Sequence, residues 1–238
     1  MIKIDHVTKK FGDFTAVDDL DLEIQDGEIF GLIGPNGAGK STTLKMITGI
    51  LPPTKGDVLL DNYSITKDTL RAKQQFGFVA DSPDMFLGMR GADYLSFVAS
   101  VYKVNRDEAQ EKAIKLAKEF NIYDSLNDYI ANYSHGMRQK IFIIGALLHT
   151  PSTWILDEPL TGLDPASSFK IKERMREHAA ENKSVLFSTH VLEVAEKLCD
   201  RIGIISKGKL VFVGTLDDLR KKSGEEGSLE ELFLEMVK

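Results

Sequence analysis

Residues 34–42 read Gly34-Pro35-Asn36-Gly37-Ala38-Gly39-Lys40-Ser41-Thr42 and fit the pattern GxxxxGKS. The apolar run 29–33 precedes this segment, and a helical pattern with Leu44, Ile47 and Leu51 on one face follows it. Strand, glycine-rich turn and helix in this order predict a phosphate-binding loop, because successive backbone N–H groups and the positive end of the helix then point at one anion. A chance glycine-rich turn would not explain the strand and the helix on either side.

Composition narrows the class of protein. Of 238 residues, 42% are hydrophobic and 28% are charged, as in an ordinary soluble globular chain. The net charge of −6 argues against nucleic acid as the main partner. The single cysteine, Cys199, excludes an internal disulfide and a cysteine-rich metal site. Residues 1–6 lack the apolar region of a signal peptide, and the run 141–148 is too short to span a bilayer, so we expect a cytoplasmic protein.

The N-terminal part of the chain is rich in short alternating or β-branched stretches. They cover residues 2–7, 15–17 and 20–24, with turn signals at Gly12-Asp13 and Asp26-Gly27. Hairpins at both turns would build an antiparallel sheet ahead of the phosphate-binding core. Further strands are predicted at 57–60 and 76–79.

The middle of the chain has a different pattern. Helical periodicity covers residues 91–101, 106–120 and 135–149, with no convincing strand between them. This predicts a helical insertion over about residues 84–150 in an otherwise mixed chain.

Apolar strands and helices alternate again towards the C-terminus. The predicted elements are strands at 153–158 and 184–190, a helix at 166–182 between them, a hairpin of 201–205 with 209–213 about Lys207-Gly208, and a last helix at 228–237. This alternation predicts a parallel sheet that is buried on both faces. The last helix has one apolar face, which predicts packing on its own domain, with a partner-binding helix as the alternative.

The predicted fold class is therefore α/β. It combines a P-loop NTPase core with a mainly parallel sheet, an N-terminal antiparallel β subdomain and an inserted α-helical subdomain. We expect a single domain over residues 1–238, with a C-terminal helical extension over about 215–238.

Polar side chains follow three of the predicted parallel strands directly. Lys40 should reach the terminal phosphates, and the Ser41 hydroxyl should bind a magnesium ion that bridges them. Asp157 would hold the same ion, while Glu158 would orient or activate water near the γ-phosphate. His190 becomes a plausible contact for that phosphate or water, because ligands of parallel sheets bind at the carboxyl ends of the strands.

Two further segments have more than one interpretation. Ser134, in the segment 133–139, either only caps the helix that follows or also contributes to an anion site there. Phe11 ends the first predicted hairpin strand and is either a core residue or a platform for an adenine ring.

Together these residues resemble the nucleotide-binding subunit of an ATP-binding cassette (ABC) transporter. The resemblance covers essentially the whole chain. Besides the phosphate loop, its motifs are Phe11 at the aromatic A-loop position, Tyr133 to Gln139 at the signature position, Asp157-Glu158-Pro159, Gly162-Leu163-Asp164-Pro165 as the D-loop, and Ser188-Thr189-His190 as the H-loop.

The resemblance implies an ATPase that uses ATP and Mg²⁺ in a head-to-tail dimer, either a homodimer or a heterodimer with another ABC ATPase subunit. It also implies a position on the cytoplasmic face of the cell membrane, bound to integral membrane permease subunits that move as the dimer closes and reopens. The site residues that it implies are Phe11, Val17 and residues 34–42 for ATP; Lys40, Glu158 and His190 for catalysis; Ser41, Asp157 and Asp81 for the metal; Ser134, His135, Gly136 and Met137 for the ATP of the other subunit; and Asp164 in the D-loop.

The chain departs from the family pattern at two places. The signature, usually LSGGQ, has Tyr133, His135 and Met137 at its first, third and fifth positions, although the phosphate-facing Ser134 and Gly136 remain. Asp81 stands where the family has the Q-loop glutamine. An aspartate is shorter and charged, so it could bind magnesium but would repel an unscreened γ-phosphate.

Three functions remain open at this point. The resemblance favours a transport motor, and the signature variant with the short C-terminal extension points towards export. A soluble ABC-type ATPase that is not coupled to transport is the alternative, although a single acidic cassette shows no basic surface for ribosomes or DNA. A cassette without hydrolytic activity is the third, and the intact Lys40, Asp157, Glu158 and His190 argue against it.

Overall fold

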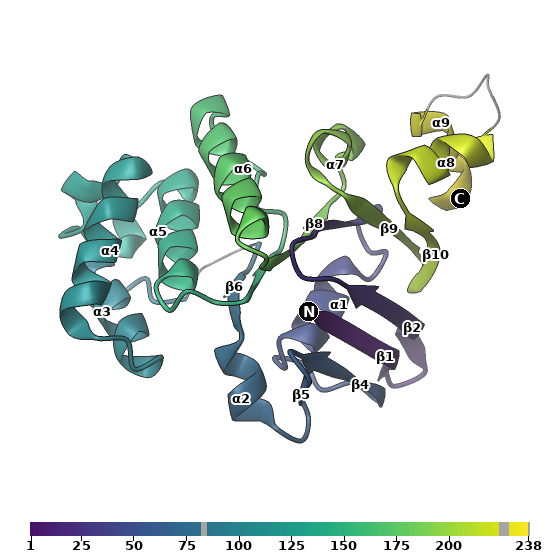
Figure 1. Cartoon of the computed structure of the whole chain (residues 1–238), viewed down its shortest axis with the longest axis horizontal. Coiled ribbons are helices and arrows are strands. Elements are labelled where there is room, and N and C mark those ends of the chain that lie inside the picture. The colour runs from purple at the N-terminus through teal and green to yellow at the C-terminus, as the bar shows by residue number, and fades with distance from the viewer. Residues whose placement is uncertain (82–84, 224–228, 238) are drawn as a thin grey trace.

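The computed structural model describes residues 1–81, 85–223 and 229–237. It contains an antiparallel sheet and a mainly parallel sheet, with three helices at one end of the molecule and the C-terminal helices at the other (Figure 1). The predicted fold class is therefore confirmed.

The antiparallel sheet has the strand order β2-β1-β4-β5. Its strands are β1 (Ile2–Phe11), β2 (Phe14–Ile24), β4 (Lys55–Leu60) and β5 (Tyr63–Ser64). The turn at Gly12 forms the predicted hairpin, with Phe11 opposite Phe14. The stretches predicted separately at 15–17 and 20–24 are one strand, β2, in which Asp19 takes a left-handed backbone conformation with φ 51°.

The second sheet has the strand order β10-β9-β3-β8-β7-β6. Its strands are β3 (Ile29–Ile33), β6 (Phe76–Val79), β7 (Thr153–Leu156), β8 (Ser184–Thr189), β9 (Arg201–Ser206) and β10 (Lys209–Gly214). All neighbouring pairs are parallel except β9 with β10, which form the predicted hairpin. Every residue of β3, β7 and β8 is buried, as expected for strands covered on both faces.

The prediction of a hairpin at Asp26-Gly27 was wrong. This turn joins β2 of the antiparallel sheet to β3 of the parallel sheet, where β3 pairs with β8 and β9. The physical reason is the composition of β3: its continuous apolar run, Ile29–Ile33, must be buried on both faces, and the antiparallel sheet does not provide that. The turn therefore connects the two sheets.

The described helices are α1 (Lys40–Ile47), α2 (Thr69–Gln74), α3 (Gly91–Val101), α4 (Arg106–Glu119), α5 (His135–Leu147), α6 (Pro165–Ala180), α7 (Leu192–Leu198), α8 (Leu216–Ser223) and α9 (Leu229–Val237). Short 3-10 turns lie at Tyr123–Ser125 and Ile130–Asn132. The sequence analysis had not predicted α2 or β5, which are short.

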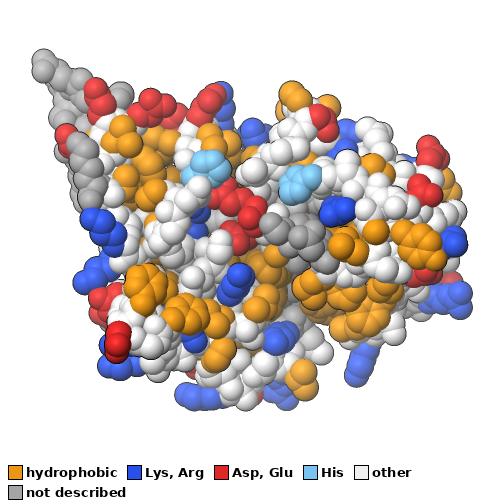
Figure 2. Space-filling view, turned by 180° about the vertical axis from the view of Figure 1, so that it is seen from behind, with side chains coloured by type: hydrophobic (Ala, Val, Ile, Leu, Met, Phe, Trp, Pro, Cys, Tyr) orange, Lys and Arg blue, Asp and Glu red, His pale blue; other side chains and the backbone are white. Residues whose placement is uncertain are grey.

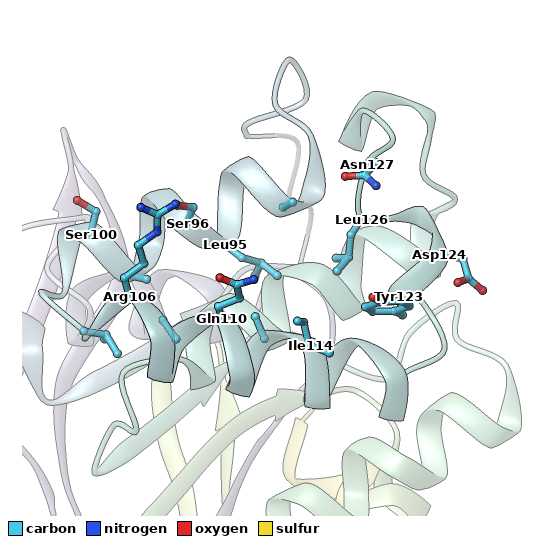
Figure 3. A pocket seen from close by; sticks show the side chains of 15 residues that line it. Leu95, Ser96, Ser100, Arg106, Gln110, Ile114, Tyr123, Asp124, Leu126 and Asn127 are labelled. Carbon is cyan, nitrogen blue, oxygen red and sulfur yellow. The ribbon is translucent and has the colours of Figure 1, made fainter.

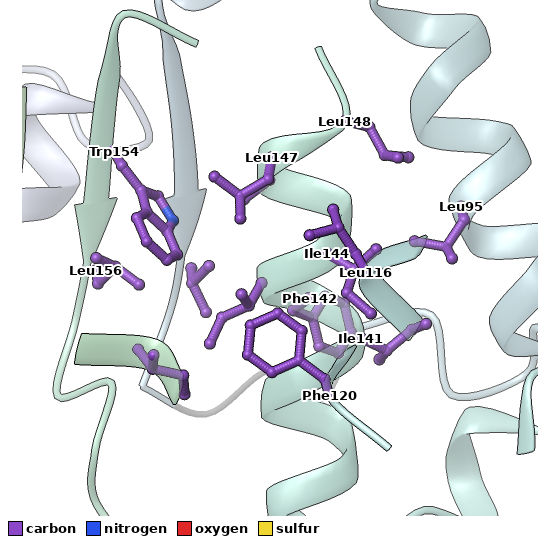
Figure 4. Close-up of a cluster of buried hydrophobic side chains, with 14 of the residues drawn as sticks. Leu95, Leu116, Phe120, Ile141, Phe142, Ile144, Leu147, Leu148, Trp154 and Leu156 are labelled. Atoms are coloured by element: carbon purple, nitrogen blue, oxygen red, sulfur yellow. The ribbon is translucent and has the colours of Figure 1, made fainter. Parts of the chain in front are cut away.

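Helices α3, α4 and α5 pack around one hydrophobic cluster that continues to the parallel sheet (Figure 4). In this cluster the α5 side chains of Phe142 and Leu147 lie between the sheet residue Trp154 and the other helices. An ion pair also ties α4 to α6, because the Arg174 Nε donates to the Glu119 carboxylate at 2.6 Å. The three helices are thereby held to the sheet by both apolar packing and charge.

The C-terminal helices cover β9. Leu232 of α9 is buried with Phe212 and Leu219, and the Ser206 hydroxyl of β9 donates to the Val237 carbonyl. The apolar face of the last helix thus packs on its own domain, as predicted. Ser228, where that helix was expected to begin, lies outside the described residues. No helix in the described part of the chain is both long and apolar enough to cross a membrane.

Candidate functional site

The phosphate-binding loop lies between β3 and α1, next to the antiparallel sheet. Gly39 begins α1 with φ 113°, and a Cβ there would lie 2.9 Å from the Ala16 carbonyl of β2. Only glycine fits this backbone and this close approach. The turn between β9 and β10 supports the loop from the other side, because the Gly208 N–H donates to the Ala38 carbonyl at 2.8 Å. The loop is therefore held between the two sheets.

Lys40 has its ammonium group inside the loop. Its side chain is only 6% exposed, and its Nζ donates to the carbonyls of Gly34 at 2.7 Å and Pro35 at 3.3 Å. The same Nζ lies 3.4 Å from the Glu158 Oε1. A nearly buried cation inside a glycine-rich loop at the start of a helix suits the terminal phosphates of a nucleotide.

Asp157 and Glu158 lie directly after β7. The strand was predicted to cover residues 153–158, but it ends at Leu156. The alternation of side chains between the two faces of a strand therefore does not apply to Asp157 and Glu158. Asp157 is 3% exposed, and Glu158 takes a left-handed conformation with φ 47° that turns the chain at this point. Adjacent carboxylates can therefore serve different tasks: one is buried beside the sheet, and the other reaches Lys40.

His190 follows β8 and contacts Glu158. The distance from its Nδ1 to the Glu158 Oε2 is 3.0 Å. One oxygen of the Glu158 carboxylate thus faces the Lys40 ammonium and the other faces an imidazole. Since β3, β8 and β7 are neighbours in this order, the sheet brings the three side chains together at the carboxyl ends of its strands.

Asp81 shares the electrostatic environment of this group. Burial and the negative charges of Asp157 and Glu158 raise its pKa, and the nearby His135 and His190 oppose this shift. On the face shown in Figure 2, acidic side chains gather between two histidines. The repulsion among these carboxylates favours a cation or a proton at this place.

We expect Asp81→Ala to lower turnover stimulated by a membrane partner about tenfold, while ATP affinity stays nearly unchanged. Asp81 is close enough to Asp157 and Glu158 to be influenced by their charges, but it contacts neither Lys40 nor the phosphate loop through any described hydrogen bond or ion pair. Stimulated ATPase activity and equilibrium ATP binding measure the two effects, with Asp217→Ala at an exposed position of α8 as the control. An equal loss of affinity and turnover would contradict a coupling role.

The signature segment begins α5. The Ser134 Oγ accepts a hydrogen bond from the Met137 N–H and caps the helix, so the capping role is present. Tyr133 is 3% exposed and donates its hydroxyl hydrogen to the Ser125 carbonyl, which makes it an anchor. The His135 Nε2 lies 3.3 Å from the Thr161 carbonyl, and Gly136 adjoins Leu163. The signature therefore contacts the D-loop of its own subunit.

Asp164 has a clear local role. It begins α6 as the N-cap, and its carboxylate accepts hydrogen bonds from the backbone N–H and the hydroxyl of Ser167, which lower its pKa. Since Pro165 occupies the first turn, this segment has the usual helix-start pattern. Any contact of Asp164 with a second subunit stays a prediction.

The two residues predicted beside the adenine ring differ in exposure. Phe11 is 50% exposed at the end of β1, and the Lys9 Nζ lies over its ring at 5.2 Å from the centroid, so a base would stack on the opposite face of the ring. Val17 is fully buried in the core under the phosphate loop. A contact of Val17 with ATP would have to involve its backbone.

Sequence reasoning missed two supports of the site. The Ser188 hydroxyl donates to the Asp157 Oδ1 at 2.6 Å, and the backbone of Gly208 bonds to the phosphate loop. Ser188 belongs to the predicted H-loop segment Ser188-Thr189-His190, but its contact with Asp157 depends on the register between β7 and β8. The residues next to Ser188 in the sequence do not determine that register.

Comparison with known proteins identifies the family. A family model described as ABC transporter matches residues 17–161, more than half of the chain. The chain belongs to the ABC transporter ATP-binding family. The linearmycin resistance ATP-binding protein LnrL of Bacillus subtilis (strain 168) is 35% identical over 94% of this chain and 72% of its own length. The ABC transporter ATP-binding protein NatA of the same organism is 34% identical over 95% of this chain and 94% of its own length.

Solved structures agree with this assignment. A structure described as the ATP-binding subunit of an ABC transporter matches with a TM-score of 0.94 and 33% identity, and each chain covers the other completely. The ATP-binding cassette MJ0796, solved as a dimer in a post-hydrolysis state with ADP and Pi, matches with a TM-score of 0.81 and 25% identity over 91% of this chain and 99% of its own. This chain thus belongs to the ABC ATPase family, and its Lys40, Glu158 and His190 lie together at the carboxyl ends of the parallel strands.

Proposed function

We propose that this ABC ATPase is the motor subunit of a transporter and hydrolyses ATP between two subunits arranged head to tail. The contact of Glu158 with both Lys40 and His190 carries the proposal. A carboxylate held between a phosphate-binding lysine and an imidazole is suited to accept a proton from the attacking water, while the lysine neutralises phosphate charge. His190 orients the carboxylate.

The residues beside Lys40 fit a magnesium ion. Asp157 is almost completely buried, and the only described hydrogen bond to its carboxylate comes from Ser188 and reaches Oδ1. Its other oxygen and the Ser41 hydroxyl are hard oxygen ligands of the kind that Mg²⁺ prefers when it also binds phosphates. Bound there, the ion would neutralise phosphate charge. Asp81 is a further candidate ligand.

The proposal of a dimer rests on the signature segment and on a relative. Ser134 and Gly136 lie at the start of α5, where free backbone N–H groups can bind the ATP of a second subunit, with His135 and Met137 beside them. MJ0796 is described as dimeric with ADP and Pi. Steady-state ATPase activity of the purified chain with Mg²⁺, followed together with its mass by light scattering, tests the proposal. Absence of both turnover and ATP-dependent association would count against it.

The helical end of the molecule has a groove that suits a membrane subunit. The groove has a volume of about 820 Å³ and lies between α3 and α4 (Figure 3). Its floor is apolar and its rim polar, with Arg106 and Asp124 at opposite ends. An amphipathic helix fits such a groove, with its apolar face on the floor and charges at its ends. We infer that a cytoplasmic helix of the permease docks here.

We expect Ile114→Glu to weaken binding to the permease about 30-fold, because a charge in an apolar interface centre costs about 2 kcal/mol. Ile114 lines the groove, whereas the exposed Lys115 next to it does not, so Lys115→Glu is the matched control. Capture of the chain by detergent-solubilised permease measures the effect. Equal capture of both variants would exclude the groove as the docking site.

We infer that the direction of transport is export. The relative LnrL is named for linearmycin resistance, which supports export as the direction for this chain. Transport assays in vesicles with the permease test this. If no membrane protein co-purifies with an active ATPase, the alternative of an ABC-type ATPase without transport coupling replaces the motor.

A further inference from the structure

Ser188 connects the Asp157 carboxylate to the backbone of Glu158 through a single hydroxyl. It lies on β8 and is fully buried. Its Oγ donates to the Asp157 Oδ1 at 2.6 Å and accepts the backbone N–H of Glu158 at 3.0 Å. The register that pairs Leu156 with Phe187 brings Asp157 next to Ser188. One buried group therefore touches both consecutive residues.

The direction of these two hydrogen bonds determines which atoms of Asp157 and Ser188 stay available to other partners. An ionised carboxylate only accepts hydrogen bonds, so the Ser188 hydroxyl hydrogen is committed to Asp157. This occupies Oδ1 and fixes the plane of the carboxylate, which leaves Oδ2 for another partner. The Ser188 oxygen is then free to accept the Glu158 N–H.

The second bond holds a backbone that is otherwise unfavourable. Glu158 has φ 47°, a conformation that side chains with a Cβ adopt at a cost. The bond to Ser188 anchors the N–H of this turn and thereby helps to keep the Glu158 side chain beside Lys40 and His190.

We propose that Ser188 is a positioning residue that orients Asp157 for the metal and Glu158 for the attacking water. This inference rests on the proposed ATPase function. Groups that orient a metal ligand typically change metal affinity or activity 10–100-fold when they are removed. Because Ser188 orients two residues, both the metal dependence and the turnover should respond.

The same strand provides a matched control. Ser184 is also on β8, is also fully buried, and exchanges a hydrogen bond of 2.9 Å with Thr153 of β7. Ser184→Ala removes a buried hydroxyl bond between the same two strands at the end away from the site. Ser188→Ala and Ser184→Ala therefore cost the sheet comparable stability, and thermal unfolding of both checks this.

The primary readout is the equilibrium affinity for a fluorescent ATP analogue, measured with and without Mg²⁺. In Ser188→Ala the gain in affinity on adding Mg²⁺ should shrink about tenfold, and the affinity without Mg²⁺ should stay that of the wild type. In steady-state assays kcat should fall about 10–100-fold with a smaller change in KM. Ser188→Thr, which retains the hydroxyl, should recover most of both effects.

Two results would overturn the inference: Ser188→Ala matching Ser184→Ala in Mg²⁺-dependent binding, or Ser188→Thr behaving like Ser188→Ala while folded. If the wild type binds ATP but never hydrolyses it, the proposed function fails. The comparison of binding with and without Mg²⁺ still decides the role of Ser188 in that case.

Discussion

Glu158→Gln is expected to lower ATP turnover by about 10²–10⁴-fold, the range for removing a general base. The substitution keeps the shape of the side chain beside Lys40 and His190, but it removes the charge that pairs with these residues and accepts the proton. ATP binding should persist, because the phosphate loop is unchanged. The repulsion between the carboxylate and the γ-phosphate also disappears, so the ATP-bound dimer should accumulate.

Steady-state phosphate release and light scattering with ATP and Mg²⁺ measure this result. Glu193→Gln is the control, since Glu193 is an exposed residue of α7 that pairs with Lys197 at 2.6 Å. Turnover of Glu158→Gln within about threefold of the control would show that another group is the base. Loss of turnover without any ATP-dependent dimer would retain the catalytic role but count against the head-to-tail arrangement.

Most of the candidate site was predictable because its residues belong to short, contiguous sequence motifs. The phosphate loop, Asp157 with Glu158, and His190 each follow an apolar strand, and the rule that ligands bind at the carboxyl ends of parallel strands placed them together. The helices at 91–101 and 106–120 were predictable from their periodicity for the same reason: the signal is local.

The errors arose where the outcome depends on distant contacts. The turn at Asp26-Gly27 has the residues of a hairpin, but residue types in a turn do not report which sheet the following strand joins. Strand register explains why the contact of Ser188 with Asp157 was missed, and the burial of Val17 means that any contact of this residue with ATP would have to involve its backbone. Sheet membership, strand register and burial all depend on contacts between segments that are far apart in the sequence.

Two buried histidines predict a steep loss of stability in mild acid. Burial lowers the pKa of His149 to about 4 and that of His178 to about 4, against the ordinary value of 6.5. His149 stacks on Tyr102 with 3.7 Å between ring centroids, and its Nε2 donates to the Phe76 carbonyl. His178 packs edge-on against Trp154. Both rings are therefore neutral in the native protein at pH 7.

The direction of the change in unfolding free energy with pH follows from how many protons the native and the unfolded states bind. Above pH 6.5 both histidines are neutral in the native and the unfolded chain, so they contribute no pH dependence. Between pH 6.5 and about 4 the unfolded chain takes up protons that the native protein does not bind, and the free energy of unfolding falls as the pH falls. The loss should reach about 2 kcal/mol for each histidine at pH 5.

Urea unfolding between pH 7 and pH 4.5 measures this dependence, and His178→Leu should remove about half of the slope that the two histidines produce. His178 is the better choice, because its buried Nε2 has no hydrogen-bond partner among the described residues. His6→Gln is the control: the hydrogen bond that the exposed His6 donates to the Asp19 carboxylate raises the pKa of His6, so that group works in the opposite direction. An unchanged slope in His178→Leu would mean that this ring is already charged in the native protein, and acid sensitivity would then have to come from the paired carboxylates instead.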